Sequence, residues 1–179
     1  LSVQDMVLIA VFTAIMAICS WISVSAGPVP FTLQTFAVFV TAALLGTKRG
    51  TIAVVVYILL GIIGVPVFAG LTGGPSVIAG PTGGFIVGFI LTAIIIGLLM
   101  NLANGKSEVV KLVITVVAMV LGDVACFAIG TVWFMVVTNN TVAVALTYCV
   151  IPYIIPDIAK IVVATIIANR VKKYVQIFN

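Results

Sequence analysis

The segment IPYIIPDIAK, residues 151–160, lies inside a long apolar run near the C-terminus, yet it contains an aspartate and a lysine. Asp157 and Lys160 are three positions apart, which places both side chains on one face of a helix. Pro156 has no N–H and leaves the carbonyl of Pro152 without its helical partner, and Pro152 frees another carbonyl one turn earlier. In hydrocarbon, such groups must face other protein or water rather than lipid. We therefore expect the rest of the chain to form the wall and mouth of a cavity around this segment.

The composition predicts an integral membrane protein. Of the 179 residues, 64% are hydrophobic and 7% are charged, and the mean hydropathy is +1.44. Soluble domains carry roughly 25% charged residues. The length suits a single membrane domain over residues 1–179 that is all α-helical.

Several function classes are disfavoured. The formal net charge is +4, but basic and aromatic residues are not interleaved, so we expect no nucleic-acid partner. The sequence has no histidine, and its three cysteines lie in apolar segments without metal-binding spacing, so we expect no metal site and no cofactor. A membrane enzyme would need a cluster of carboxylates, histidines or a nucleophile at one depth, which the chain does not offer.

Apolar segments separated by turn signals predict six membrane-spanning helices. The second and third segments have about 13 residues each, or about 20 Å of helix against a hydrocarbon core of about 30 Å, so they cannot cross unaided. The expected spans are residues 4–24, 33–45, 51–63, 85–102, 109–137 and 142–171.

Two connections are rich in Gly and Pro and carry no charge. Residues 64–84 contain seven Gly and three Pro, and residues 25–31 read SAGPVPF. Irregular chain at membrane depth is tolerated only where it is buried in protein or lines a cavity. We expect these connections to be re-entrant or irregular outer loops that cap the cavity; an ordinary surface loop is the alternative for residues 64–84.

The cations predict the orientation. Seven of the eight Lys and Arg residues fall on the connections between spans two and three and between spans four and five, and on the C-terminal tail. By the positive-inside rule, this side is cytoplasmic, so both termini are expected inside and the Gly/Pro-rich connections outside. The seven are Lys48, Arg49, Lys106, Lys111, Arg170, Lys172 and Lys173.

Three charged residues are expected to share one layer within the membrane, about 15–20 Å from the inner boundary. They are Asp157, Lys160 and Asp123 of the fifth span. Intramembrane ionisable residues mark substrate or ion pathways, although the Asp157–Lys160 pair could also be a structural ion pair. Asp123 could pair with Lys160, carry a proton, line the cavity or serve packing through a local hydrogen bond.

Further candidate binding residues lie near the predicted outer mouth. Gln34, Thr32 and Thr35 begin the second span, although Thr32 could be a helix cap. Where the fourth span begins, at Thr82, Gly83 and Gly84, free N–H groups could face a carboxylate or carbonyl. The aromatic candidates for an apolar chamber are Phe31, Phe68, Phe85, Tyr148, Tyr153 and Trp133, although each could instead be a packing residue or an interface anchor.

Five motifs stand out along the chain: GPVPFTLQTFAVFVTAALLGTKRG at 27–50, GVPVFAG at 64–70, AGPTGGF at 79–85, GTVWF at 130–134 and PDIAK at 156–160. Together they resemble the motifs of the BioY family, the biotin-binding S components of energy-coupling factor (ECF) transporters. Many relatives have Gly where this chain has Pro156, and Tyr where it has Phe85. Asp123 matches no pattern of the family.

The resemblance implies six helices, cytoplasmic termini, location in a prokaryotic cell membrane and high-affinity capture of biotin from outside. It also implies a transmembrane coupling protein and two ATPase subunits as partners. The family's docking face of small residues on the first helix corresponds to Ala10 and Ala14, and its polar ligand contacts correspond to Asp157 and Lys160.

An S component for another vitamin, a membrane enzyme and a structural bundle are the alternatives. The orientation of biotin, transport without the ATPase module and the oligomeric state stay open.

Overall fold

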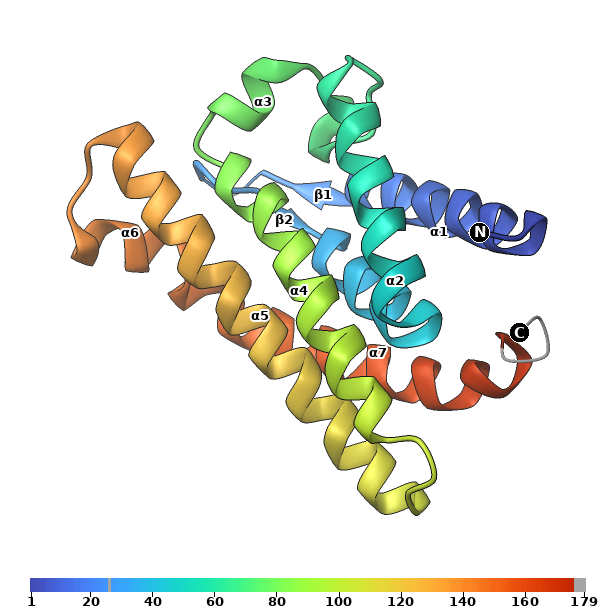
Figure 1. Cartoon of the computed structure of the whole chain (residues 1–179). Helices are drawn as coiled ribbons and strands as arrows, with labels where there is room; N and C mark the ends of the chain where they lie inside the picture. Colours follow the sequence, from blue (N-terminus) through green and yellow to red (C-terminus); the bar gives the residue numbers. More distant parts are fainter. Residues whose placement is uncertain (26, 176–179) are drawn as a thin grey trace.

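The computed structural model describes residues 1–25 and 27–175 and is almost entirely helical (Figure 1). One short hairpin pairs Ser23 with Thr32 in antiparallel register. In chain order the elements are α1 (Val3–Trp21), β1 (Ser23–Val24), β2 (Phe31–Thr32), α2 (Gln34–Ile62), α3 (Pro75–Ala79), α4 (Gly83–Leu102), α5 (Glu108–Thr138), α6 (Val142–Cys149) and α7 (Ile154–Val175), with 3₁₀ turns at Ala69–Leu71 and Ile151–Tyr153.

The helices form the predicted membrane bundle. Among the described residues, five stretches are long and apolar enough to cross a membrane: α1, α2, α4, α5 and the stretch Val142–Lys172. Because α2 bends sharply at Gly46, it contributes two segments, and the bundle has six. The six-helix fold expected from the sequence is confirmed.

The bend in α2 depends on glycine. Gly46 has φ 72° and ψ −174°, a backbone conformation that residues with a side chain rarely adopt. Beside the bend, a Cβ on Gly50 would lie 3.0 Å from the Cα of Ala42, so the two halves of α2 are in close contact. The halves correspond to the predicted spans 33–45 and 51–63, and their connection is helical except at Gly46.

Small residues also bring α4 close to its neighbours, α2 on one side and α5 on the other (Figure 1). A Cβ on Gly97 would lie 2.4 Å from the Cα of Thr47, and one on Gly88 would lie 3.3 Å from the Cα of Cys126. The Thr92 hydroxyl donates to the Gly122 carbonyl at 2.9 Å. In a membrane the hydrophobic effect does not drive helices together, so they associate through close backbone packing and hydrogen bonds of this kind.

The irregular connection after α2 folds back onto the bundle. The N–H of Gly74 donates to the carbonyl of Gly61 at 2.6 Å. The ring of Phe68 occupies the space beside Gly61, where a Cβ would lie 1.9 Å from it. α1 holds the same connection, because the Ser20 hydroxyl donates to the Val67 carbonyl and the Trp21 indole donates to the Pro66 carbonyl. Within residues 64–84, Val67, Phe68, Gly83 and Gly84 are buried, while much of the connection is exposed. That it lies at membrane depth stays a prediction.

The last predicted span, residues 142–171, is not one continuous helix. It breaks into α6 and α7 at Val150, where φ is −121° and ψ is −59°. Pro152 has no N–H to donate to the carbonyl of Tyr148, so the ladder of helical hydrogen bonds cannot pass this point. After the break, Tyr153 lies at the cavity described below.

The cation-bearing connections gather at one end of the bundle, as predicted. Arg49 at the bend of α2 pairs with Asp5 near the N-terminus, with 2.6 Å between Nε and Oδ1. A crevice at this end brings Gly46, Asn104 and Lys172 together, and the N-terminal end of α1 and the C-terminal end of α7 lie on the same side of Figure 1. That this end faces the cytoplasm stays a prediction from the positive-inside rule.

Candidate binding site

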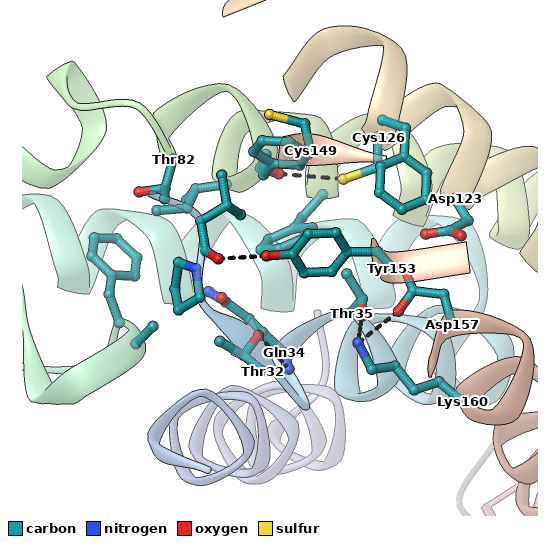
Figure 2. Close-up of a pocket in the computed structure, with 18 of the residues that line it drawn as sticks. Thr32, Gln34, Thr35, Thr82, Asp123, Cys126, Cys149, Tyr153, Asp157 and Lys160 are labelled. Atoms are coloured by element: carbon teal, nitrogen blue, oxygen red, sulfur yellow. Dashed lines mark hydrogen bonds and ion pairs between the residues drawn. The ribbon is translucent and has the colours of Figure 1, made fainter. Parts of the chain in front are cut away.

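A cavity of about 230 Å³ lies among α2, α4, α5, α7 and the two irregular connections (Figure 2). Its wall is mainly apolar and aromatic, with a few polar side chains on it. The lining residues are Val29, Pro30, Thr32, Gln34, Thr35, Phe68, Ala69, Thr72, Val77, Thr82, Phe85, Ile86, Phe89, Asp123, Cys126, Phe127, Cys149, Tyr153, Asp157 and Lys160.

The first turns of α7 supply an ion pair to this wall. The Lys160 ammonium lies 2.6 Å from Asp157 Oδ1 and donates a second hydrogen bond, at 3.1 Å, to the Thr35 hydroxyl of α2. Asp157 is 3% exposed. An ammonium has three donors, and these two contacts use two of them. Among the residues that the structure describes, the third donor of Lys160 and the second oxygen of Asp157 have no further hydrogen-bond partner, so both could contact a molecule in the cavity.

α5 adds a second carboxyl group to the same region. Asp123, Cys126 and Phe127 lie at helical spacing on one face of α5, and all three line the cavity. The Asp123 carboxyl group lies on the same side of the cavity as Asp157 (Figure 2). The cavity therefore has a polar region formed by two acids and one lysine.

Aromatic side chains form much of the remaining wall. Tyr153 stacks on Phe31 with ring centroids 4.4 Å apart and lies 6.4 Å from Phe127, which makes an edge contact with Phe85. The Tyr153 hydroxyl donates to the carbonyl of Val29 in the first irregular connection. Phe31 is not among the lining residues; it supports Tyr153 from behind.

Gln34 connects the cavity to the irregular connection after α2. Its side-chain amide donates to the Tyr57 hydroxyl at 2.6 Å, and that hydroxyl donates to the Val67 carbonyl at 2.8 Å. Phe68, the next residue, lines the cavity. The position of Phe68 is thus fixed by buried hydrogen bonds from α2.

The start of α4 differs from the prediction in detail. Thr82 lines the cavity, but Gly83 and Gly84 do not. A Cβ on Gly83 would lie 1.7 Å from the Ile78 carbonyl oxygen, and one on Gly84 would lie 2.2 Å from the Cβ of Trp133. These two glycines allow close packing of α4 against α3 and α5.

Ten of the lining residues were not predicted: Val29, Pro30, Ala69, Thr72, Val77, Ile86, Phe89, Cys126, Phe127 and Cys149. Cys126 and Phe127 follow Asp123 at the spacing of one helical face, so their position could have been inferred from that of Asp123. Cys149, at the end of α6, had no such signal, because its placement depends on the helix break at Val150. The predicted docking residues, Ala10 and Ala14, are exposed on α1, away from the cavity.

A concave, mainly apolar pocket with a few convergent polar groups is the usual form of a small-molecule site. Among the described residues, no group of three or more Cys, Asp or Glu side chains could hold a metal ion. Fold and site together define a membrane protein that binds a small molecule within its helix bundle.

The chain belongs to the BioY family, whose model matches residues 1–177. It is 42% identical over 170 residues to the biotin transporter BioY of Thermotoga maritima, covering 95% of this chain and 96% of that protein. It is 35% identical over 177 residues to the biotin transporter BioY of Rhizobium etli, covering 96% and 94%.

A solved structure has the same fold. The crystal structure at 2.1 Å of the S-component for biotin from an ECF-type ABC transporter superposes with a TM-score of 0.84. The two chains are 26% identical, and the match covers 96% of this chain and 92% of the other. Family members are components of transporters and not enzymes, in agreement with the prediction from the sequence.

Proposed function

We propose that this chain binds biotin and serves as the substrate-capture subunit of an ECF-type vitamin transporter in the cell membrane. The observation that carries the proposal is the Asp157–Lys160 pair, which is buried in the bundle and faces a cavity of small-molecule size. The names of the relatives and of the solved structure support biotin as the ligand.

The chemistry of biotin suits the wall of the cavity. Biotin has a cyclic urea with two N–H donors and one carbonyl, an apolar thioether ring and a carboxylate tail. In this proposal, Asp157 accepts hydrogen bonds from the urea N–H groups, and Lys160 donates a hydrogen bond to the urea oxygen or to the carboxylate of biotin. Phe68, Phe85 and Tyr153 contact the apolar ring, and the polar contacts at the mouth come from Gln34 and Thr82.

The proposal includes partners that supply energy. No nucleotide-binding motif occurs in the sequence, so an ECF transmembrane coupling protein and two ATPase subunits would drive transport. The coupling protein would dock on the small residues Ala10 and Ala14, which are exposed on α1. Small side chains let two membrane helices approach closely.

The decisive experiment is equilibrium binding to the purified protein. Biotin should bind tightly, and the diamine that lacks the urea carbonyl should bind far more weakly. Asp157→Asn should lose about 1.5–3 kcal/mol, or one to two decades of biotin affinity, because a charge-assisted acceptor is replaced by a neutral one. A panel of other vitamins serves as the control. Tight binding of one of them with no binding of biotin would contradict the proposal.

The docking surface is tested separately. Ala14→Phe should abolish co-purification with the coupling protein and its ATPases while biotin affinity stays unchanged, because the added ring blocks close approach. Ala17→Ser, on the buried side of α1, is the matched control. Normal assembly of the Ala14→Phe variant would show that the partner docks elsewhere.

A further inference from the structure

We infer that Asp123 is a specificity-determining residue that accepts a hydrogen bond from one ureido N–H of the ligand, while Asp157 accepts from the other. The inference rests on the proposed function, in which Asp157 alone accepts from the urea N–H groups. Here the two N–H groups are divided between Asp157 and Asp123. It is carried by the position and surroundings of Asp123.

Asp123 is buried but has no partner among the described residues. The residue is 7% exposed, and its carboxyl group makes no hydrogen bond or ion pair with any other side chain or backbone group that the structure describes. A buried carboxyl group without a partner is costly, and at membrane depth the cost is larger still. In contrast, Asp157 is held by Lys160 at 2.6 Å.

The side chain is directed at the cavity. Asp123 is the one acidic residue of α5 beyond the first turn, and it lies on the helix face that also carries the cavity residues Cys126 and Phe127. Its neighbours on the opposite face, Leu121 and Val124, are exposed on the lipid side of the bundle. Figure 2 shows its carboxyl oxygens beside the cavity, near those of Asp157. The missing partner is therefore expected among the atoms of the ligand.

The polar groups match a cyclic urea in number and kind. The two N–H bonds of a cyclic urea diverge on either side of its carbonyl, so one carboxylate held in place by Lys160 cannot meet both. Two acceptors, Asp123 and Asp157, and one donor, Lys160, provide a partner for each of the three groups. A ligand that leaves a buried polar group of the site without a partner binds much more weakly. A second acceptor therefore increases the preference of the site for ligands that carry both N–H groups.

The test combines substitutions of the two acidic residues with methylation of the two ureido nitrogens. Biotin and its derivatives methylated at either ureido nitrogen are titrated against the wild type, Asp123→Ala, Asp123→Asn and Asp157→Asn. Biotin affinity should fall about 10- to 100-fold in Asp123→Ala and less in Asp123→Asn, whose amide oxygen still accepts. Methylation of one nitrogen should weaken binding to the wild type at least about tenfold but to Asp123→Ala less than about threefold. Methylation of the other nitrogen should weaken binding to the wild type and should have a smaller effect on binding to Asp157→Asn.

Two controls separate contact from structure. Thr92→Val removes the hydrogen bond to the Gly122 carbonyl next to Asp123 and should leave all methylation effects unchanged. The ligand-free Tm of Asp123→Asn should equal or exceed that of the wild type, because a carboxyl group without a partner does not stabilise the empty protein.

Equal methylation losses in the wild type and Asp123→Ala would overturn the inference, even if biotin affinity fell, because the residue would then act through structure alone. In that case biotin still binds the wild type and the proposed function stands. Failure of the wild type to bind biotin would overturn both proposals.

Discussion

Two ion pairs in this molecule have the same contact distance of 2.6 Å but lie in different surroundings. Asp157 and Lys160 are neighbours on one helix and face the cavity. Asp5 and Arg49 are far apart in sequence and join the start of α1 to the bend of α2 at the end of the bundle where the cations gather. The inner pair lies within one turn of α7 and reaches α2 through the hydrogen bond from Lys160 to Thr35, whereas the two charges of the outer pair themselves join two helices. The comparison separates a pair suited to binding from a pair suited to folding.

The cost of burial strengthens this distinction. The side chains of Asp157 and Lys160 are 4% and 11% exposed, against 13% and 25% for Asp5 and Arg49. A buried ion pair loses hydration free energy that the attraction between the two charges only partly offsets. Such a pair therefore contributes little to the stability of the fold. In the proposed function, hydrogen bonds from both members to a ligand are what the deeper pair is for.

The largest expected effect follows from breaking the inner pair on one side. Asp157→Leu leaves Lys160 buried beside Thr35 without its carboxylate, and we expect about 3–5 kcal/mol of destabilisation together with loss of biotin binding. The double variant Asp157→Leu/Lys160→Met should regain most of the stability but none of the binding. Thermal unfolding of the ligand-free proteins and biotin titration measure both. A double variant as unstable as the single one would show that the pair maintains the fold.

A smaller effect, of the opposite kind, is expected at the outer pair. Arg49→Met should lower the Tm of the ligand-free protein, by less than Asp157→Leu does, because α1 loses an attachment to α2. The biotin affinity should stay within about twofold of the wild type, since neither residue lines the cavity. The N-terminal cap of α1, in which Asp5 accepts from the Ser2 N–H at 2.8 Å, is retained in this variant. A large loss of affinity would show that the two pairs are coupled.

The smallest effect is expected at the residue that links the inner pair to a second helix. Thr35→Val removes the hydroxyl that accepts from Lys160 at 3.1 Å and should cost about 0.5–1.5 kcal/mol of biotin affinity. Thr35→Ser keeps the hydroxyl and should bind as the wild type does. If both variants bind equally well, the ammonium of Lys160 is positioned by Asp157 alone.

Much of the fold could be predicted from local patterns. Apolar runs and their lengths indicated the six segments, and the placement of cations indicated which connections share an end. The gap between the two short apolar runs predicted a connection there, and the structure shows a bend at Gly46 within α2. The break between α6 and α7 was less predictable, because two prolines permit a break but do not fix where the chain leaves the helix.

The site could be predicted only in part. Asp157 and Lys160 share a face because helical geometry alone requires it. Phe31 and Tyr153 looked equivalent as aromatic candidates, but Tyr153 lines the cavity and Phe31 stacks behind it. Gly83 and Gly84 looked like a binding turn, but their backbone contacts with Ile78 and Trp133 make them packing residues.

The sequence by itself determined the membrane class, the helical segments and the spacing of the charged residues along each helix, because these depend on neighbours within about one turn of chain. Tertiary structure decided which faces meet at the cavity and that Asp123 lies there near Asp157 with no hydrogen-bond partner in the described part of the chain. Those relations depend on how each helix is rotated and tilted against the others, and close contacts such as that between Gly88 and Cys126 set these angles between residues far apart in the sequence.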